Sequence, residues 1–183
     1  MSQIWTRRRL LHTALAGGAG LSLARFSAAR DGQPAREIEL FNTHTSETAR
    51  VVFRRGDAYD ASAIAQLRNL LRDHRNGERH DIDVGLYEQL ADLAAVANCD
   101  PRFEIISGYR SPESNSKMAA RAGSGVAKRS LHMEGRAIDV RLHACGCARL
   151  RDLALAAKRG GVGYYRRSDF VHIDTGSFRT WAG

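Results

Sequence analysis

SLHMEGRAID, residues 130–139, places a histidine and an aspartate seven positions apart, at His132 and Asp139. Asp139 already lies in AIDVRL (137–142), whose apolar character predicts a strand. Gly135 lets the chain turn back between the two side chains, because glycine adopts backbone conformations that other residues avoid. An imidazole and a carboxylate that converge on one point are typical of a divalent metal site.

A third ligand is expected, because a catalytic zinc usually takes three protein ligands and keeps a fourth position for water. FVHID (170–174) offers it: His172 lies in an apolar strand, two residues from Asp174 and on the same strand face. The sequence therefore predicts a site made of His132, Asp139 and His172. Two histidines and one carboxylate suit zinc, although iron or manganese can occupy the same set.

The pattern around these motifs predicts a single α+β domain with a mainly antiparallel sheet flanked by helices. Most predicted helices precede most strands, and no internal repeat is present. The predicted elements are a hairpin of residues 36–42 and 49–53, helices from Asp60 to 76–77 and from Asp83 to Asn98, a strand at 103–107, a helix at 114–121, a loop at 123–129, a strand at 137–142, a helix at 148–158, and strands at 161–165 and 170–174.

The first 29 residues predict an export signal. Arg7, Arg8 and Arg9 precede an apolar, small-residue stretch that ends near Ala24 or Ala29, as in a twin-arginine-type signal peptide. About 14 mildly apolar residues are too short for a membrane-spanning helix, which needs about 20. We therefore expect cleavage, no stable membrane insertion afterwards, and a periplasmic location.

Most of the net charge of +8 comes from residues 1–30, which contain the predicted signal peptide. Five arginines and no acidic residue lie in residues 1–30, so the remainder carries only +3. Nucleic-acid binding proteins present a denser positive surface. We expect neither a nucleic-acid partner nor nuclease activity.

The three cysteines, Cys99, Cys145 and Cys147, all lie in the part predicted to be exported, where disulfides persist. A bridge from Cys145 to Cys147 would close a very small, strained loop. Cys99 is therefore expected to pair with one of the other two, and the sequence leaves open which one. The spacing does not suit a zinc finger.

Three stretches together resemble a known family: SGYRSPESN (107–115), SLHMEGRAID (130–139) and GVGYYRRSDFVHIDTGSFRTW (161–181). In order and spacing they are similar to the zinc metallopeptidases that share the D-alanyl-D-alanine peptidase and Hedgehog fold. Within these, the chain looks most similar to the murein endopeptidase K group, exported enzymes that cut peptidoglycan cross-links. HTSE (44–47) also resembles an early motif of that group. The resemblance places the peptidase domain at residues 36–183.

The resemblance implies that His132, Asp139 and His172 bind Zn²⁺. It also implies that Arg110 steadies the polarised carbonyl or a substrate carboxylate, since its planar guanidinium holds such a group at two points. Related dipeptidases carry a glutamate as general base three residues before the last histidine, where this chain has Asp169. Asp174 is the rival for that role, or it orients His172 as a partner of the ligand.

The implied activity is hydrolysis of amide bonds in stem-peptide cross-links, either diaminopimelate–diaminopimelate or D-alanine–diaminopimelate, by a monomer. Carboxypeptidase or dipeptidase activity stays open. The serine-enzyme motif G-x-S-x-G is absent. The alternative is a zinc-stabilised cell-wall or protein-binding module without turnover, because a fold does not fix a function. Further substrate contacts are expected from the same motifs: Ser107, Tyr109, Asn115 and Ser130.

Overall fold

The computed structural model describes residues 35–98, 100 and 102–183. The predicted signal peptide, residues 1–29, lies outside this part of the chain, and so does Cys99. The pairing of Cys99 therefore stays a prediction, while Cys145 and Cys147 are both buried. Within the described residues, no helix is long and apolar enough to cross a membrane.

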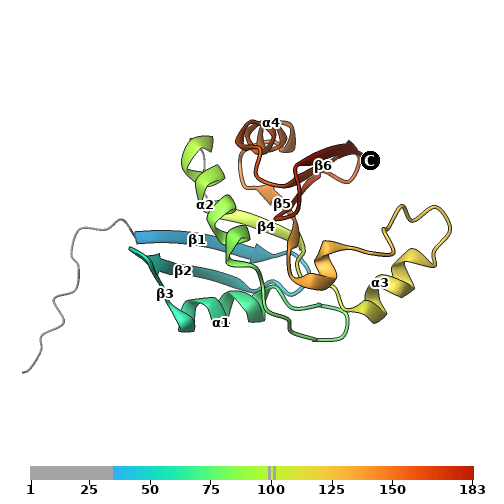
Figure 1. The fold of residues 1–183 in the computed structure, drawn as a ribbon, viewed down its shortest axis with the longest axis horizontal. Coiled ribbons are helices and arrows are strands. Elements are labelled where there is room, and N and C mark those ends of the chain that lie inside the picture. The colour runs from blue at the N-terminus through green and yellow to red at the C-terminus, as the bar shows by residue number, and fades with distance from the viewer. Residues whose placement is uncertain (1–34, 99, 101) are drawn as a thin grey trace, which may run out of the picture. The chain divides into compact units, whose positions relative to one another are not determined.

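One eight-stranded sheet organises the described residues, in the order β3-β2-β1-β4-β5-β7-β6-β8 (Figure 1). Neighbouring strands run antiparallel except for the pairs β1/β4 and β6/β8, which are parallel. This confirms the predicted α+β fold with a mainly antiparallel sheet. The strands are β1 (Ala35–Asn42), β2 (Thr48–Arg55), β3 (Ala58–Tyr59), β4 (Arg102–Ser107), β5 (Ala137–Leu142), β6 (Gly161–Tyr165), β7 (Phe170–Asp174) and β8 (Arg179–Ala182).

Three of the helices in the described residues, α1, α2 and α4, cover one face of the sheet and build the core there. The helices are α1 (Ala61–Leu70), α2 (Val84–Ala97), α3 (Pro112–Ala119), α4 (Cys147–Ala157) and the short 3₁₀ helix η1 (Leu131–Glu134). Helix α1 packs on β2, while α2 and α4 pack against each other and contact β5. Ile138, Val140, Val171 and Ile173 belong to this core. Because side chains alternate along a strand, Asp139 and His172 point to the opposite face.

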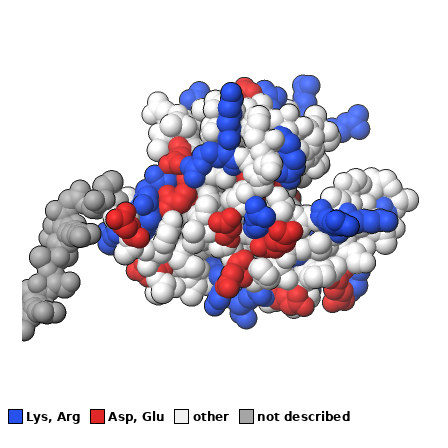
Figure 2. All heavy atoms as spheres, in the orientation of Figure 1, with Lys and Arg blue, Asp and Glu red and all other residues white. Residues whose placement is uncertain are grey.

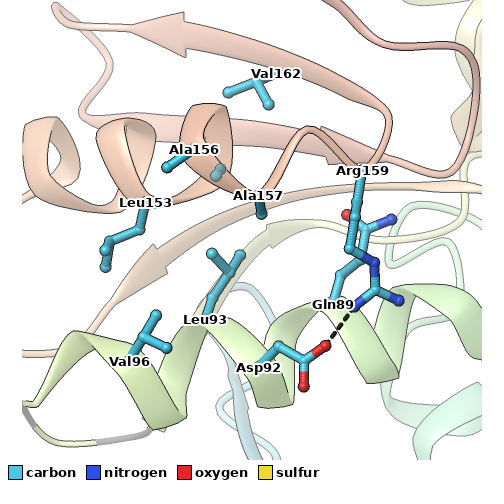
Figure 3. A pocket seen from close by; sticks show the side chains of 10 residues that line it. Gln89, Asp92, Leu93, Val96, Leu153, Ala156, Ala157, Arg159 and Val162 are labelled. Carbon is cyan, nitrogen blue, oxygen red and sulfur yellow. Dashed lines mark hydrogen bonds and ion pairs between the residues drawn. The ribbon is translucent and has the colours of Figure 1, made fainter.

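A shallow apolar groove runs between α2 and α4, on the helical side of the sheet (Figure 3). Leu93 and Val96 of α2 face Leu153 and Ala157 of α4 across it. An ion pair between Arg159 and Asp92 lies at one end. Its lining includes none of the three predicted metal ligands.

A β-bulge turns the end of β4 toward the ligand face. Phe103 pairs with Leu142 and Ile105 with Val140 on the core side, but the register then shifts and Ser107 pairs with Asp139. Bulges re-aim side chains in this way and are common beside functional sites. The bulge therefore brings the start of the SGYRS motif next to a predicted ligand.

The main differences from the sequence prediction are two helix boundaries and one strand. Helix α1 ends at Leu70 instead of residues 76–77, and the segment that follows is irregular. Helix α3 begins at Pro112 because the Ser111 hydroxyl caps it, accepting a hydrogen bond from Ser114 N at 3.1 Å. Strand β8 was not predicted, since its pairing with β6 is distant in sequence.

Gly135 is required at the turn between His132 and Asp139. Its φ is +65°, and a Cβ atom there would lie 2.0 Å from the carbonyl oxygen of Asp81. We predict that Gly135→Ala destabilises the metal-free protein by about 3 kcal/mol or more in urea unfolding. Gly123 has φ +68° and open space around it, so Gly123→Ala should lose only about 1 kcal/mol. Equal losses in the two variants would contradict the role of the Asp81 contact.

Candidate metal centre

Three ligand-type atoms from three elements meet at one point. His132 lies in η1, Asp139 in β5, and His172 directly opposite Asp139 in β7. The distance from His172 Nδ1 to Asp139 Oδ1 is 2.8 Å, and His132 Nε2 lies 3.2 Å from His172 Nδ1 and 3.3 Å from Asp139 Oδ1. All three residues are buried. The structure thus brings together the three residues that the sequence predicted as ligands.

Outer hydrogen bonds fix which nitrogen of each histidine faces the centre. His132 Nδ1 lies 2.8 Å from the carbonyl oxygen of Gly108, an acceptor only, so Nδ1 carries the proton and Nε2 presents its lone pair. His172 Nε2 lies 3.2 Å from Asp174 Oδ2, which likewise leaves Nδ1 toward the centre. Such outer partners are the usual way in which a metal-binding histidine is oriented.

The spacing of the three atoms fits a tetrahedral metal. Ligand atoms at the usual zinc distances lie about 3.3 Å apart in a tetrahedron, close to the observed 3.2, 3.3 and 2.8 Å. Without a cation or a proton between them, two nitrogen lone pairs and a carboxylate would repel one another. The donor set, two imidazoles and one carboxylate with a fourth position left free, is that of a catalytic metal site.

Asp174 is a fully buried carboxylate, and both of its oxygens have hydrogen-bonding partners. Its Oδ1 accepts hydrogen bonds from Gly161 N and Gly176 N, each at 2.8 Å, and from Arg179 Nη1 at 3.1 Å. Its Oδ2 accepts from Arg179 Nη2 at 2.6 Å and faces His172 Nε2. Asp174 therefore contacts Nε2 of His172, while Nδ1 of the same ring faces Asp139 and His132.

The hydrogen bonds set the protonation states of the metal-free centre. Burial disfavours the charged form of Asp139, but hydrogen bonds and charge from His132 and His172 outweigh it and hold its pKa well below the usual range. Burial lowers the pKa of His172, yet its hydrogen bonds to Asp139 and Asp174 prevail and raise this pKa to about 9. At neutral pH, a proton therefore takes the place that a metal would take.

Arg110 is a buried cation beside the ligands. Its Nη2 lies 4.0 Å from Asp139 Oδ2, and its Nη1 donates to Asn115 Oδ1 at 3.1 Å. Its Nε is buried without a hydrogen-bond partner among the described residues. Burial lowers the pKa of Arg110, and Asp139 is the strongest opposing influence. A guanidinium with an unused donor in this position can receive an anionic oxygen.

Asn115 holds both Arg110 and the loop that follows α3. Besides accepting from Arg110, it donates through Nδ2 to the carbonyl oxygens of Ala127 and Lys128 at 3.1 and 3.3 Å. All the hydrogen-bonding groups of its side-chain amide are therefore used within the protein. This makes Asn115 a support for Arg110.

The other predicted contacts surround the centre at different depths. Ser107 is buried and pairs with Asp139 across the strands. Tyr109 is buried, and its ring stacks on His80 with the centroids 4.9 Å apart. Ser130 is half-buried and precedes η1. His44 is exposed and bonds through Nε2 to the carbonyl oxygen of Ile106 at 3.0 Å.

Asp169 lies in the turn before β7, with a left-handed φ of +51°. Its side chain is exposed, and its carboxylate lies 3.4 Å from Arg141 Nε. A hydrogen bond with Asp169 and burial raise the pKa of the Cys147 thiol to about 12, burial having the larger effect. Asp169 lines a small pocket that contains none of the three ligand residues.

Sequence reasoning missed Asp73, which fixes the SGYRS motif from the segment after α1. This buried carboxylate accepts hydrogen bonds from Ser111 N at 2.9 Å and Arg75 N at 3.0 Å. Burial tends to raise its pKa, but the hydrogen bonds, that of the Ser114 hydroxyl foremost, lower it to about 2. A pattern of helical periodicity gives no signal for such a residue, because its partner Ser111 lies 38 positions away.

The Asp73 shift predicts a pH dependence of stability. Because the folded-state pKa lies below the ordinary 3.8, the stabilisation is present above about pH 4 and is lost as pH falls toward 2. Asp73→Asn should lower the free energy of unfolding by about 2 kcal/mol at pH 7, and its difference from the parent should shrink between pH 4 and 2. Urea titrations at pH 7, 4 and 2.5 measure this. Asp152→Asn, at an exposed position, is the control, and a pH-independent difference would contradict the assignment.

Comparison with known proteins identifies the family of this chain. The family model described as "Peptidoglycan L,D-endopeptidase MepK" matches residues 30–181. The chain is 38% identical over 177 residues to the peptidoglycan L,D-endopeptidase MepK of Escherichia coli K12, covering 96% of both chains. It is 34% identical over 149 residues to the probable peptidoglycan L,D-endopeptidase MepK of Haemophilus influenzae, covering 81% of this chain and 80% of that one. No solved structure matches. The chain therefore belongs to the peptidoglycan L,D-endopeptidase MepK family, a family of peptidases.

Proposed function

We propose that this chain is a zinc-dependent peptidoglycan endopeptidase that hydrolyses an amide bond in the cross-links between stem peptides. The observation that carries the proposal is the convergence of His132 Nε2, Asp139 Oδ1 and His172 Nδ1, with both histidine tautomers fixed from behind. The names of the related proteins supply the substrate class. Zn²⁺ is the metal that best suits this donor set.

The bond we favour is the diaminopimelate–diaminopimelate cross-link. An L,D-endopeptidase, as the relatives are named, cuts between an L and a D centre. The diaminopimelate–diaminopimelate cross-link has that stereochemistry, whereas D-alanine–diaminopimelate joins two D centres.

In this proposal the chain's own residues hold and orient the reacting groups. A bound zinc would supply an acidified water and a Lewis acid for the scissile carbonyl. His132, Asp139 and His172 would hold it, and Asp174 keeps the Nδ1 of His172 turned inward. Arg110 offers its unpaired Nε–H to the oxygen on which negative charge develops.

Two measurable properties, kcat and metal affinity, distinguish the general base from a residue that orients a ligand. A general base changes kcat when it is replaced, while a residue that orients a ligand changes metal affinity. Asp174, with its contact to His172, fits the orienting role. Asp169 stays the sequence-based hypothesis for the base, and its carboxylate lies 3.4 Å from Arg141 Nε.

An enzyme that acts on peptidoglycan works outside the cytoplasm, and we propose that this one works in the periplasm. In this proposal residues 1–29 are a twin-arginine-type signal, and the mature chain is a monomer. The part of the surface seen in Figure 2 carries basic and acidic side chains side by side. Arg36 and Arg54, for example, both pair with Glu88. This mixed charge suits a peptide substrate with both carboxylates and amines.

The test is mass spectrometry of muropeptides after incubation of the zinc-loaded protein with cross-linked sacculi. We expect monomers to appear from diaminopimelate–diaminopimelate dimers, to disappear with a chelator, and to return on addition of zinc. Monomers only from D-alanine–diaminopimelate dimers would overturn the choice of bond. Zinc binding and sedimentation with sacculi, without product, would replace the enzyme by the binding module.

A further inference from the structure

A row of residues crosses four strands on the ligand face and ends at a tryptophan. Asp139 pairs with His172, His172 with Gly163, and Gly163 with Trp181. Directly paired residues on neighbouring strands point to the same face. The row therefore extends the ligand face from β5 through β7 and β6 to β8.

Gly163 lets the Trp181 ring lie close to the centre. A Cβ atom on Gly163 would lie 2.5 Å from the indole, so only glycine leaves this space free. The indole covers the position, and its centroid lies 5.1 Å from that of the His172 ring. Because Gly163 has no side chain, Trp181 can lie close to His172.

Trp181 in turn orients the hydroxyl of Tyr165. The indole Nε1–H donates to Tyr165 Oη at 3.0 Å. Because an indole nitrogen is only a donor, the hydroxyl must accept there and direct its own proton elsewhere. Tyr165 lies two residues from Gly163 on the same strand face, and its ring stacks on Phe170 with a centroid distance of 4.4 Å. Among the described residues, no acceptor for its proton is present.

Two donors thus lie on two sides of the ligands without a protein acceptor. Arg110 is beside Asp139, and its buried Nε–H has no partner among the described residues. Tyr165 is bonded to Trp181, whose ring lies near that of His172. Burial lowers the pKa of Arg110, and Asp139, more than Tyr165, raises it. Donors arranged around a reacting centre favour an acceptor that gains negative charge.

We propose that Tyr165 is a catalytic residue whose hydroxyl donates a hydrogen bond to the scissile carbonyl oxygen as it becomes an oxyanion, with Trp181 as the positioning residue that orients the phenol. No bond is made or broken at Tyr165, and its proton remains on the phenol. This inference rests on the proposed function, since it needs an amide carbonyl at the centre.

The decisive variant is Tyr165→Phe, which removes the hydroxyl and keeps the ring on Phe170. We expect kcat on the cross-linked muropeptide dimer to fall about a hundredfold, with KM within about twofold, because the bond strengthens only in the transition state. Zinc content and the melting temperature should equal those of the parent. Trp181→Phe should lower kcat less, since it leaves the hydroxyl in place but unoriented.

The neighbouring tyrosine supplies the matched control. Tyr164 faces the other side of β6, where its ring lies under the Arg151 guanidinium at 4.6 Å. Tyr164→Phe should leave kcat and KM unchanged. A Tyr165→Phe variant with unchanged kcat, or one that loses zinc affinity and thermal stability in parallel with kcat, would overturn the proposal.

A second readout separates this inference from the proposed function. A phosphinate analogue of the cross-link, which carries a tetrahedral oxyanion, can be titrated by calorimetry whether or not the parent turns substrate over. We expect Tyr165→Phe to bind it at least tenfold more weakly than Tyr164→Phe. Absence of turnover in the parent would refute the proposed function alone, while equal phosphinate affinities in the two variants would refute the role of Tyr165.

Discussion

Replacing His132 by alanine should lower kcat/KM on cross-linked muropeptides by about a thousandfold or more. The variant removes one of the three proposed protein ligands, and a catalytic metal contributes several kcal/mol of transition-state stabilisation. It also leaves the 2.8 Å pair of His172 Nδ1 and Asp139 Oδ1 intact, so the fold should persist. Zinc content by mass spectrometry, kcat/KM and the melting temperature of the metal-free protein measure the three effects separately.

His143 provides the control for a histidine that is not a ligand. It is partly exposed and lies 3.0 Å from Glu104. His143→Ala should retain bound zinc and activity. A His132→Ala protein that stays folded, binds one zinc as tightly as the parent and cuts muropeptides would show that the metal centre lies elsewhere.

Asp174→Asn is the second large expected effect, although the two side chains have nearly the same shape. Gly161 N and Gly176 N both donate to one carboxylate oxygen, so they should retain the amide oxygen there. The amide NH₂ then faces His172 Nε2, and two donors cannot share that contact. The proton of His172 should move to Nδ1, the atom that faces the centre. We expect zinc affinity to fall 10- to 100-fold.

Competition titrations with a chromophoric chelator measure that affinity, and excess zinc should restore part of the activity. Asp174→Asn with unchanged zinc affinity would contradict the orienting role. Asp169→Asn is the informative companion, because its exposed carboxylate contacts Arg141 and no ligand. Loss of kcat in Asp169→Asn with full zinc affinity would assign the general base to Asp169.

The convergence of His132, Asp139 and His172 was predictable because each residue belongs to a local motif with its own geometry. His132 and Asp139 flank the glycine turn, and His172 alternates with core residues in β7. Strand alternation also places His172 and Asp174 on one face. It says less about Asp169, which lies in a turn with a left-handed φ, where the period of two no longer applies.

What could not be predicted depends on contacts between distant segments. Helix α1 was expected to reach residues 76–77, but Asp73 leaves the helix to bond Ser111 and Arg75. β8 carries no alternation of its own and forms because β6 offers an edge. Phe178, an apolar residue near the C-terminal end of the sequence, is 48% exposed, whereas Trp181 packs over Gly163 and lies near His172. Because Gly163 has no side chain, the sequence pattern around it does not indicate that Trp181 packs there.

The proton held by His172 makes folding and metal loading two separable events. A group whose pKa is raised to about 9 in the folded chain stabilises the metal-free fold most below pH 6.5, and this contribution is lost as pH rises through 9. When no metal is bound, His172 is therefore protonated at neutral pH. The proposed zinc would displace that proton on binding, so its affinity for the protein would increase with rising pH. The chain would then form the geometry of the site before it binds the metal.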